Sequence, residues 1–262
     1  GDIETRRRSR SLQTRGPLAA RLWLAVVLNL KLILYLMKKT VLAIFILISS
    51  ISFLKAQHQL EKKITKLNDN SYLIEEVDSE NRVIISGKLI SVEPEVKSGE
   101  FKFFNEKGQL EAEGVYKQNL PIGIWKYYNK KGKVIKEINY DRTIDFLQND
   151  STYNLAEVPA ILENMPTFKG KEKSYFGTYI KENLNYPIYA LKKNITDRVF
   201  VQFVICIDGS VRSLKIISSS GNLDLNMEAL RIISESPKWK PGSTNGKPYP
   251  LSVTYHVVFN TP

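Results

Sequence analysis

The chain has 262 residues, of which 43% are hydrophobic and 25% are charged, and its formal net charge is +11. This length has room for one or two domains. Residues 1–36, together with Lys38, Lys39 and Lys55, carry eight of the eleven net positive charges, which leaves +3 for residues 57–262. Because the remainder is nearly balanced and has no basic stripe, we expect no nucleic-acid partner.

Few residues in the chain could carry enzymatic chemistry. The single cysteine, Cys206, excludes an intrachain disulfide and is predicted to be a small buried hydrophobe at the end of a strand. Only two histidines occur, His58 and His256, and neither has a carboxylate at useful spacing. The sequence also lacks a glycine-rich phosphate loop and a pair of catalytic acids. We therefore predict that the protein is not an enzyme and holds no metal or cofactor.

The first predicted element after residue 36 is a secretory signal at 37–56. Met37, Lys38 and Lys39 precede an apolar run, Val41–Leu54, and Ala56 supplies a small residue for cleavage. This run of 14 residues is shorter than the roughly 20 that cross a bilayer as a helix. We expect cleavage and export to the periplasm. In the alternative, the N-terminus is retained and anchors the protein in the inner membrane.

Residues 1–36 form a separate segment. They contain an arginine-rich stretch at Arg6–Arg10 and a second apolar stretch at Leu22–Leu36. We interpret 1–36 as a non-native or upstream segment, with Met37 as the true start. The alternative is a longer membrane-inserting N-terminus with two short hydrophobic segments.

A weak repeat follows, within a predicted all-β module at 57–140. Gly99–Tyr116 and Gly123–Tyr140 align with a period of 24 residues, and each has an aromatic strand, an Asn-x-Lys-Gly turn and a second strand that ends in tyrosine. The turn glycines, Gly108 and Gly132, stand where a positive φ is needed. Residues 72–91 predict a degenerate first hairpin. The repeats resemble the MORN-type hairpins of secreted bacterial proteins.

Aromatic residues recur at fixed positions in this repeat. We predict that they pack as the core of the sheet rather than form a ligand-stacking surface, and that the module is a spacer or docking platform. Residues 141–157, which are polar and show no clear period, are the predicted linker. The repeated aromatics are Phe101, Phe103 and Phe104 in the first copy and Trp125, Tyr127 and Tyr128 in the second.

The C-terminal part begins with a predicted hairpin. Val199–Ile205 is a run of β-branched and aromatic residues, Asp208 and Gly209 form a turn, and Val211–Ser218 is the second strand. Leu251–Phe259 alternates apolar and polar side chains, so it predicts a half-buried strand.

Between these strands, residues 222–236 predict a helix. Asn222 or Asp224 can cap its start, and Pro237 stops it. The residues predicted to form its apolar face are Leu223, Met227, Leu230 and Ile233.

In this order the features of residues 186–262 resemble the C-terminal domain of the TonB family, periplasmic proteins that grip outer-membrane transporters. The matching pieces are Tyr186-Pro187, the hairpin, the helix with PKWKPG, GKP and the last strand. Val158–Gly170 resembles the segment that precedes this domain in TonB-family proteins of Bacteroidetes-type bacteria. The resemblance implies a small antiparallel sheet with helices on one face at 158–262. Together with the hairpin module, the predicted fold class is α+β.

The resemblance also implies a site and a partner. The outer edge of the last strand would be free, so an extended segment from the plug of a TonB-dependent outer-membrane transporter could add to it. Specificity would need a second surface, either helix 222–236 or the hairpin module. The alternative is an edge covered within a homodimer. The implied site is the main chain of Ser252, Val253, Thr254, Tyr255, His256 and Val257, with Tyr186 and Pro187 nearby.

Two functions follow from the resemblance. In the first, a periplasmic TonB-like protein binds transporter plugs and supports energy-dependent nutrient uptake, with ExbB and ExbD as further partners. In the second, a periplasmic adapter is not coupled to the proton-motive force. The chain departs from the family in one respect. Residues 57–157 contain only two prolines, Pro94 and Pro121, so this segment lacks a stiff proline-rich rod.

Overall fold

The computed structural model describes residues 35–44, 60–150, 155, 159, 161–168 and 174–260. Contacts divide the chain into two units, Gly1–Gln59 and Leu60–Pro262. In the first unit, residues 35–44 are helical, and the rest of the predicted signal peptide and of segment 1–36 lies outside the described residues. Among the helices that are described, none has the length and apolar character needed to cross a membrane.

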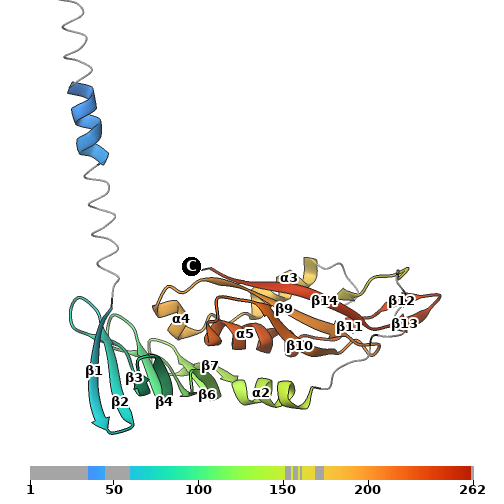
Figure 1. Cartoon of the computed structure of the whole chain (residues 1–262), viewed down its shortest axis with the longest axis horizontal. Helices are drawn as coiled ribbons and strands as arrows, with labels where there is room; N and C mark the ends of the chain where they lie inside the picture. The colour runs from blue at the N-terminus through green and yellow to red at the C-terminus, as the bar shows by residue number, and fades with distance from the viewer. Residues whose placement is uncertain are drawn as a thin grey trace, which may run out of the picture. The chain divides into compact units, whose positions relative to one another are not determined.

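The second unit begins with one antiparallel sheet whose seven strands follow one another in chain order (Figure 1). The hairpin predicted at residues 72–91 is formed by β2 and β3, and the two predicted repeats occupy β4 to β7. The strands are β1 (Glu61–Asn68), β2 (Ser71–Val77), β3 (Val83–Val92), β4 (Glu95–Phe104), β5 (Leu110–Lys117), β6 (Leu120–Tyr128) and β7 (Val134–Asn139).

The two repeat turns have the same geometry. The Asn105 side chain accepts hydrogen bonds from the main-chain N–H groups two and four residues later, and Asn129 does the same. Gly108 and Gly132 have φ values of 72° and 73°, a conformation that glycine adopts without steric cost. The predicted repeat is therefore present as two equivalent hairpins.

Three of the six aromatic residues of the repeat are buried in the core, as predicted. Tyr127 packs against the core, whereas Phe104 and Tyr128 are only partly buried and are not part of it. Phe101, Phe103 and Trp125 are all at most 2% exposed, and Phe103 lies 5.9 Å from Trp125 between ring centroids. Two glycines make room for these rings. A Cβ on Gly87 would lie 2.4 Å from the Phe101 ring, and one on Gly114 would lie 2.2 Å from the Trp125 ring.

The segment expected to be a linker begins with a helix, α2 (Tyr140–Asn149). Asn139 caps it by accepting a hydrogen bond from the N–H of Asp141. Tyr140 and Thr143 are buried, and Ile144 and Leu147 pack against the core. These four positions have helical spacing, but the pattern is weak in the sequence because one of them is threonine and the first lies in the repeat.

A second antiparallel sheet has the order β10-β9-β14, with β9 (Asp197–Ile205), β10 (Val211–Ser218) and β14 (Leu251–Phe259). The predicted hairpin and final strand are confirmed. The mixed α and β structure with antiparallel sheets also agrees with the prediction. The shorter elements are β8 (Thr167–Phe168), α3 (Ser174–Asn183), α4 (Ile188–Lys192), β11 (Trp239–Lys240), β12 (Gly242–Thr244) and β13 (Lys247–Tyr249).

The helix α5 (Leu223–Ser234) lies between the two sheets (Figure 1). It contacts β9 and β10 on one side and β6 and α2 on the other. Asn222 caps its start, as predicted, by accepting a hydrogen bond from the N–H of Leu225. Leu223 was expected on the buried face but is 39% exposed. Both sheets and α5 share one hydrophobic core, so the two predicted modules form one compact body.

Candidate functional site

The strand β14 is an edge strand. It pairs with β9 through nine consecutive residue pairs without a register shift, from Leu251 opposite Ile205 to Phe259 opposite Asp197. On its other side, no strand among the residues described by the structure pairs with it. In such a ladder the main-chain groups of alternate residues point away from the partner strand. The predicted site, Ser252–Val257, therefore lies on a regular edge strand.

The opposite edge of the same sheet is less suited to strand addition. The register of β10 against β9 shifts twice, and Ser213 in this strand has a positive φ of 52°. The N–H of Leu214 already donates to the Asp150 side chain at 3.1 Å. Bulges and covered main-chain groups are the means by which proteins block edge pairing. Of the two edges of this sheet, β14 is the more regular.

Side chains of β14 alternate between two faces, as the sequence predicts. Val257 and Phe259 are buried, Val253 and Tyr255 pack against the core, and Thr254 and His256 are exposed. The ring of His256 lies 5.7 Å from Phe200. The exposed face of β14 therefore presents polar side chains beside one aromatic ring.

Tyr186 and Pro187 lie beside the far end of the strand. The Tyr186 ring packs edge-on against Phe259, with 5.7 Å between centroids, and its hydroxyl donates to the carbonyl of Ile195 at 2.5 Å. Pro187 is buried and precedes α4. Both residues come directly before α4, and Pro187 is largely inaccessible to a partner.

A small apolar pocket of about 40 Å³ lies on the helix-facing side of β14 and is partly open to solvent. One wall is formed by Val253, Thr254 and Tyr255 of the strand itself. Phe176 of α3 lies 4.8 Å from both Tyr255 and Trp239 between ring centroids, so these packed rings fix the shape of the pocket. Sequence analysis missed this pocket because its residues come from five separate segments.

Behind the edge sheet, α5 buries a polar face against the seven-stranded sheet. Asp224, Glu228 and Arg231 are all at most 7% exposed. Their spacing of four and three residues places them on one side of the helix. Sequence analysis treated Asp224 only as a possible cap and missed Glu228 and Arg231. The spacing of charged residues within an otherwise apolar helix is the signal that could have revealed them.

Asp224 forms a buried ion pair with Lys97 of β4, with 2.7 Å between Oδ2 and Nζ. Its other oxygen accepts a hydrogen bond from the Tyr116 hydroxyl. The Lys97 ammonium lies 3.8 Å from the ring centroids of both Tyr116 and Tyr189. Burial lowers the pKa of Lys97, and the nearby Asp224 opposes that shift. This arrangement holds the start of α5 on the aromatic face of the repeat sheet.

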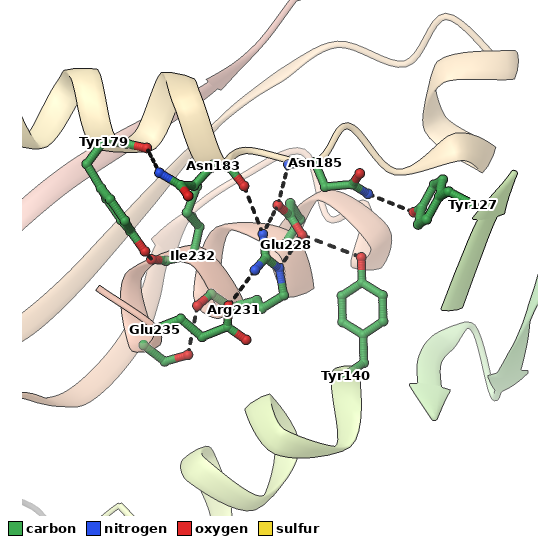
Figure 2. Close-up of polar contacts among 10 residues, drawn as sticks. Tyr127, Tyr140, Tyr179, Asn183, Asn185, Glu228, Arg231, Ile232 and Glu235 are labelled. Carbon is green, nitrogen blue, oxygen red and sulfur yellow. Dashed lines mark hydrogen bonds and ion pairs between the residues drawn. The ribbon is translucent and has the colours of Figure 1, made fainter. Parts of the chain in front are cut away.

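One turn further along, Glu228 and Arg231 organise the contacts in Figure 2. Arg231 donates from Nε and Nη2 to the two carboxylate oxygens of Glu228 at 2.8 and 2.6 Å, and from Nη2 to the carbonyl of Asn183 at 3.2 Å. Glu228 also accepts from the N–H of Asn185 at 2.6 Å and from the Tyr140 hydroxyl at 3.5 Å. The cluster joins α2, α5 and the loop after α3.

Asn185 extends the cluster to the hairpin module by donating to the Tyr127 hydroxyl at 2.7 Å. Burial raises the pKa of Glu228, against the opposing effect of Arg231. Burial likewise raises the pKa of Tyr140 and of Tyr127, so both hydroxyls stay protonated and can donate. The cluster has the character of a structural contact between the two sheets.

Further ion pairs join the C-terminal end of α4 to the seven-stranded sheet. Lys193 contacts the buried carboxylate of Glu76 in β2 at 2.7 Å, and Lys192 contacts Glu111 in β5 at 2.5 Å. Within the described part of the chain, no group of three or more His, Cys, Asp or Glu side chains could hold a metal ion. Cys206 is buried, as predicted, and His58 lies outside the described residues.

Comparison with known proteins finds a family similarity in the C-terminal part of the chain. Residues 182–261 match the sequence model of the family described as Gram-negative bacterial TonB protein C-terminal. The match includes α4, β9, β10, α5 and β14, and it confirms the predicted resemblance for this domain. The matched region begins at residue 182, after the predicted domain boundary at residue 158. A search of curated proteins found no match to the chain.

Proposed function

We propose that the chain is a periplasmic TonB-like protein that binds an extended plug segment of an outer-membrane transporter and supports energy-dependent nutrient uptake. The observation that carries the proposal is the regular edge strand β14, in a domain that matches the TonB C-terminal family. The binding groups are the outward main-chain N–H and C=O groups within Ser252–Val257. The added segment becomes a fourth strand beside β14.

The main chain alone gives a weak contact. About five hydrogen bonds at roughly 1 kcal/mol each barely match an association cost of about 4 kcal/mol or more. Tight or selective binding therefore needs further contacts. The exposed polar face of β14, with Thr254 and His256, and the apolar pocket behind it are the nearest surfaces that can provide them.

A second candidate function is a periplasmic adapter that recognises envelope proteins without coupling to the proton-motive force. One observation favours it. Leu60–Pro262 forms one compact unit in which the segment before the C-terminal domain is a packed sheet. A protein that transmits force across the periplasm needs an extended spacer and contacts with ExbB and ExbD at the inner membrane. Those contacts require a retained N-terminus.

Calorimetric titration of the purified chain with synthetic plug peptides from transporters of the same bacterium tests the binding claim. Two versions of each binding peptide are N-methylated at alternate positions, one at the odd and one at the even residues. We expect only one version to lose binding, because only alternate residues of an added strand bond to β14. Failure of all plug peptides to bind at millimolar concentration would refute the proposal, as would equal loss in both versions.

Two further measurements separate the alternatives. Fractionation of tagged protein between periplasm and inner membrane, with cross-linking to ExbB and ExbD, distinguishes the energy-coupled protein from the adapter. Sedimentation velocity of the free chain tests whether β14 is instead covered in a homodimer. A concentration-dependent dimer that plug peptides do not dissociate would mean that the edge is already occupied.

A further inference from the structure

We infer that the pocket beside β14 selects the side chain at one position of the added strand, and that it accepts a small aliphatic group. This inference rests on the proposed function, because the pocket has a role only if a strand adds to β14. It goes beyond that function by assigning a specificity site and the class of side chain that enters it.

The position of the pocket decides what can occupy it. Its wall is the stretch Val253, Thr254 and Tyr255, in the middle of the predicted site. Val253 and Tyr255 point to the same side of the sheet as the pocket, since side chains alternate along a strand. Residues directly opposite each other on paired strands share a face. A residue of an added strand that lies opposite Val253 or Tyr255 therefore directs its side chain toward the pocket.

The size and lining of the pocket define the side chain. The pocket is small, with a volume of about 40 Å³, and most of its lining residues are apolar, so it suits a small apolar group. Phe176, Phe203 and Trp239 line it with aromatic surface. Trp239 lies 6.2 Å from Phe203 between ring centroids, and both residues are buried, so the pocket cannot expand easily. This lining favours small aliphatic side chains such as alanine and valine. A charged side chain would be buried there without a partner, and a bulky aromatic one would have to displace the packed rings.

A positional scan of a plug peptide that binds the chain tests the inference. Each residue of the peptide is replaced in turn with alanine, valine, aspartate and tryptophan, and the dissociation constant is measured for the purified chain. We expect one position at which valine binds at least about fourfold tighter than alanine, which corresponds to burial of one of the two carbons that valine adds, and at which tryptophan and aspartate weaken binding at least tenfold. The two neighbouring positions, whose side chains point to the other face, should change by less than about twofold.

A reciprocal change in the protein identifies the pocket as the cause. Val253→Ala removes two methyl groups from the pocket wall and should shift the preference at that one position from valine to leucine. Val258→Ala, on the other face of the same strand and outside Ser252–Val257, is the matched control and should leave the preference unchanged. Thermal unfolding of both variants verifies that they remain folded.

The outcomes separate this inference from the proposed function. Binding of plug peptides without any selective position, or a selective position that Val253→Ala does not alter, would overturn the inference and leave strand addition intact. Failure of all peptides to bind would overturn the proposed function and this inference together. Self-association of the chain that Val253→Ala abolishes would overturn the inference by assigning the pocket to a second copy.

Discussion

Replacing Asp224 with alanine should lower the free energy of unfolding of the chain by about 3–5 kcal/mol, the usual cost of leaving one buried charge without its partner. With 2.7 Å between the charged atoms of Lys97 and Asp224, the attraction is about 6 kcal/mol at an effective dielectric constant of 20. Removing each ion from water costs several kcal/mol, so the intact pair adds little net stability.

The variant loses the attraction but keeps the cost of burying Lys97, whose side chain is only 7% exposed. The Tyr116 and Tyr189 rings, whose centroids are each 3.8 Å from the ammonium, remain in the variant, so their stabilisation of the buried charge is retained and does not enter the difference. Urea denaturation at pH 7, followed by circular dichroism, measures the difference. The matched control is Lys238→Ala, which removes an exposed ion pair with Asp208 and should cost less than about 1 kcal/mol.

A triple variant tests the same account by removing the whole buried polar group. Lys97→Met, Tyr116→Phe and Asp224→Leu together replace the buried polar group with apolar side chains of similar volume. We expect its stability to lie within about 2 kcal/mol of the unsubstituted chain, because no charge or hydroxyl remains unpaired. A cost below 1 kcal/mol for Asp224→Ala, or a triple variant less stable than Asp224→Ala, would refute this account of the contact.

Three other predictions concern the cooperativity of unfolding, a close glycine contact and the pH dependence of stability. Thermal unfolding of the Leu60–Pro262 unit should be a single calorimetric transition, because both sheets share one core, and two separate transitions would contradict this. Gly114→Ala should cost about 1–3 kcal/mol by chemical denaturation, because the new Cβ overlaps the Trp125 ring, and the cost should shrink in a Trp125→Leu background. Hydrogen bonds from the Ser210 hydroxyl and N–H lower the pKa of Asp208 to about 2. The small contribution of Asp208 to stability is therefore present above pH 3.8 and lost as the pH falls toward 2. In denaturation curves measured over a pH series, Asp208→Asn should reduce the fall in the free energy of unfolding between pH 3.8 and 2.

Local sequence patterns predicted several of the elements. Alternation predicted β14, and the β-branched runs around Asp208 and Gly209 predicted the hairpin of β9 and β10. The Asn-x-x-Gly turns predicted the equivalent hairpins of the repeat. Each of these signals lies within a few residues of the structure that it specifies, so it is visible in one sequence.

The contacts between the two sheets were not predictable in this way. Lys97 and Asp224 are 127 residues apart in the chain, and each is an ordinary charged residue in its local segment. Their pairing exists only because α5 lies across the aromatic face of the repeat sheet. Leu223 illustrates the same limit, since helical spacing placed it on the buried face, whereas the polar side of α5 is buried as well.

The burial of α5 also limits where a partner can find a second surface. Helix 222–236 was one candidate, but nine of the twelve residues of α5 are buried, so it cannot provide much contact area. The aromatic face of the hairpin sheet is likewise occupied by contacts within the unit. The opposite face of that sheet remains, with Lys88, Lys102 and Ile124 exposed on its strands. A partner that needs more than the β14 edge and its pocket can use this outer face, or the polar face of β14 with Thr254 and His256.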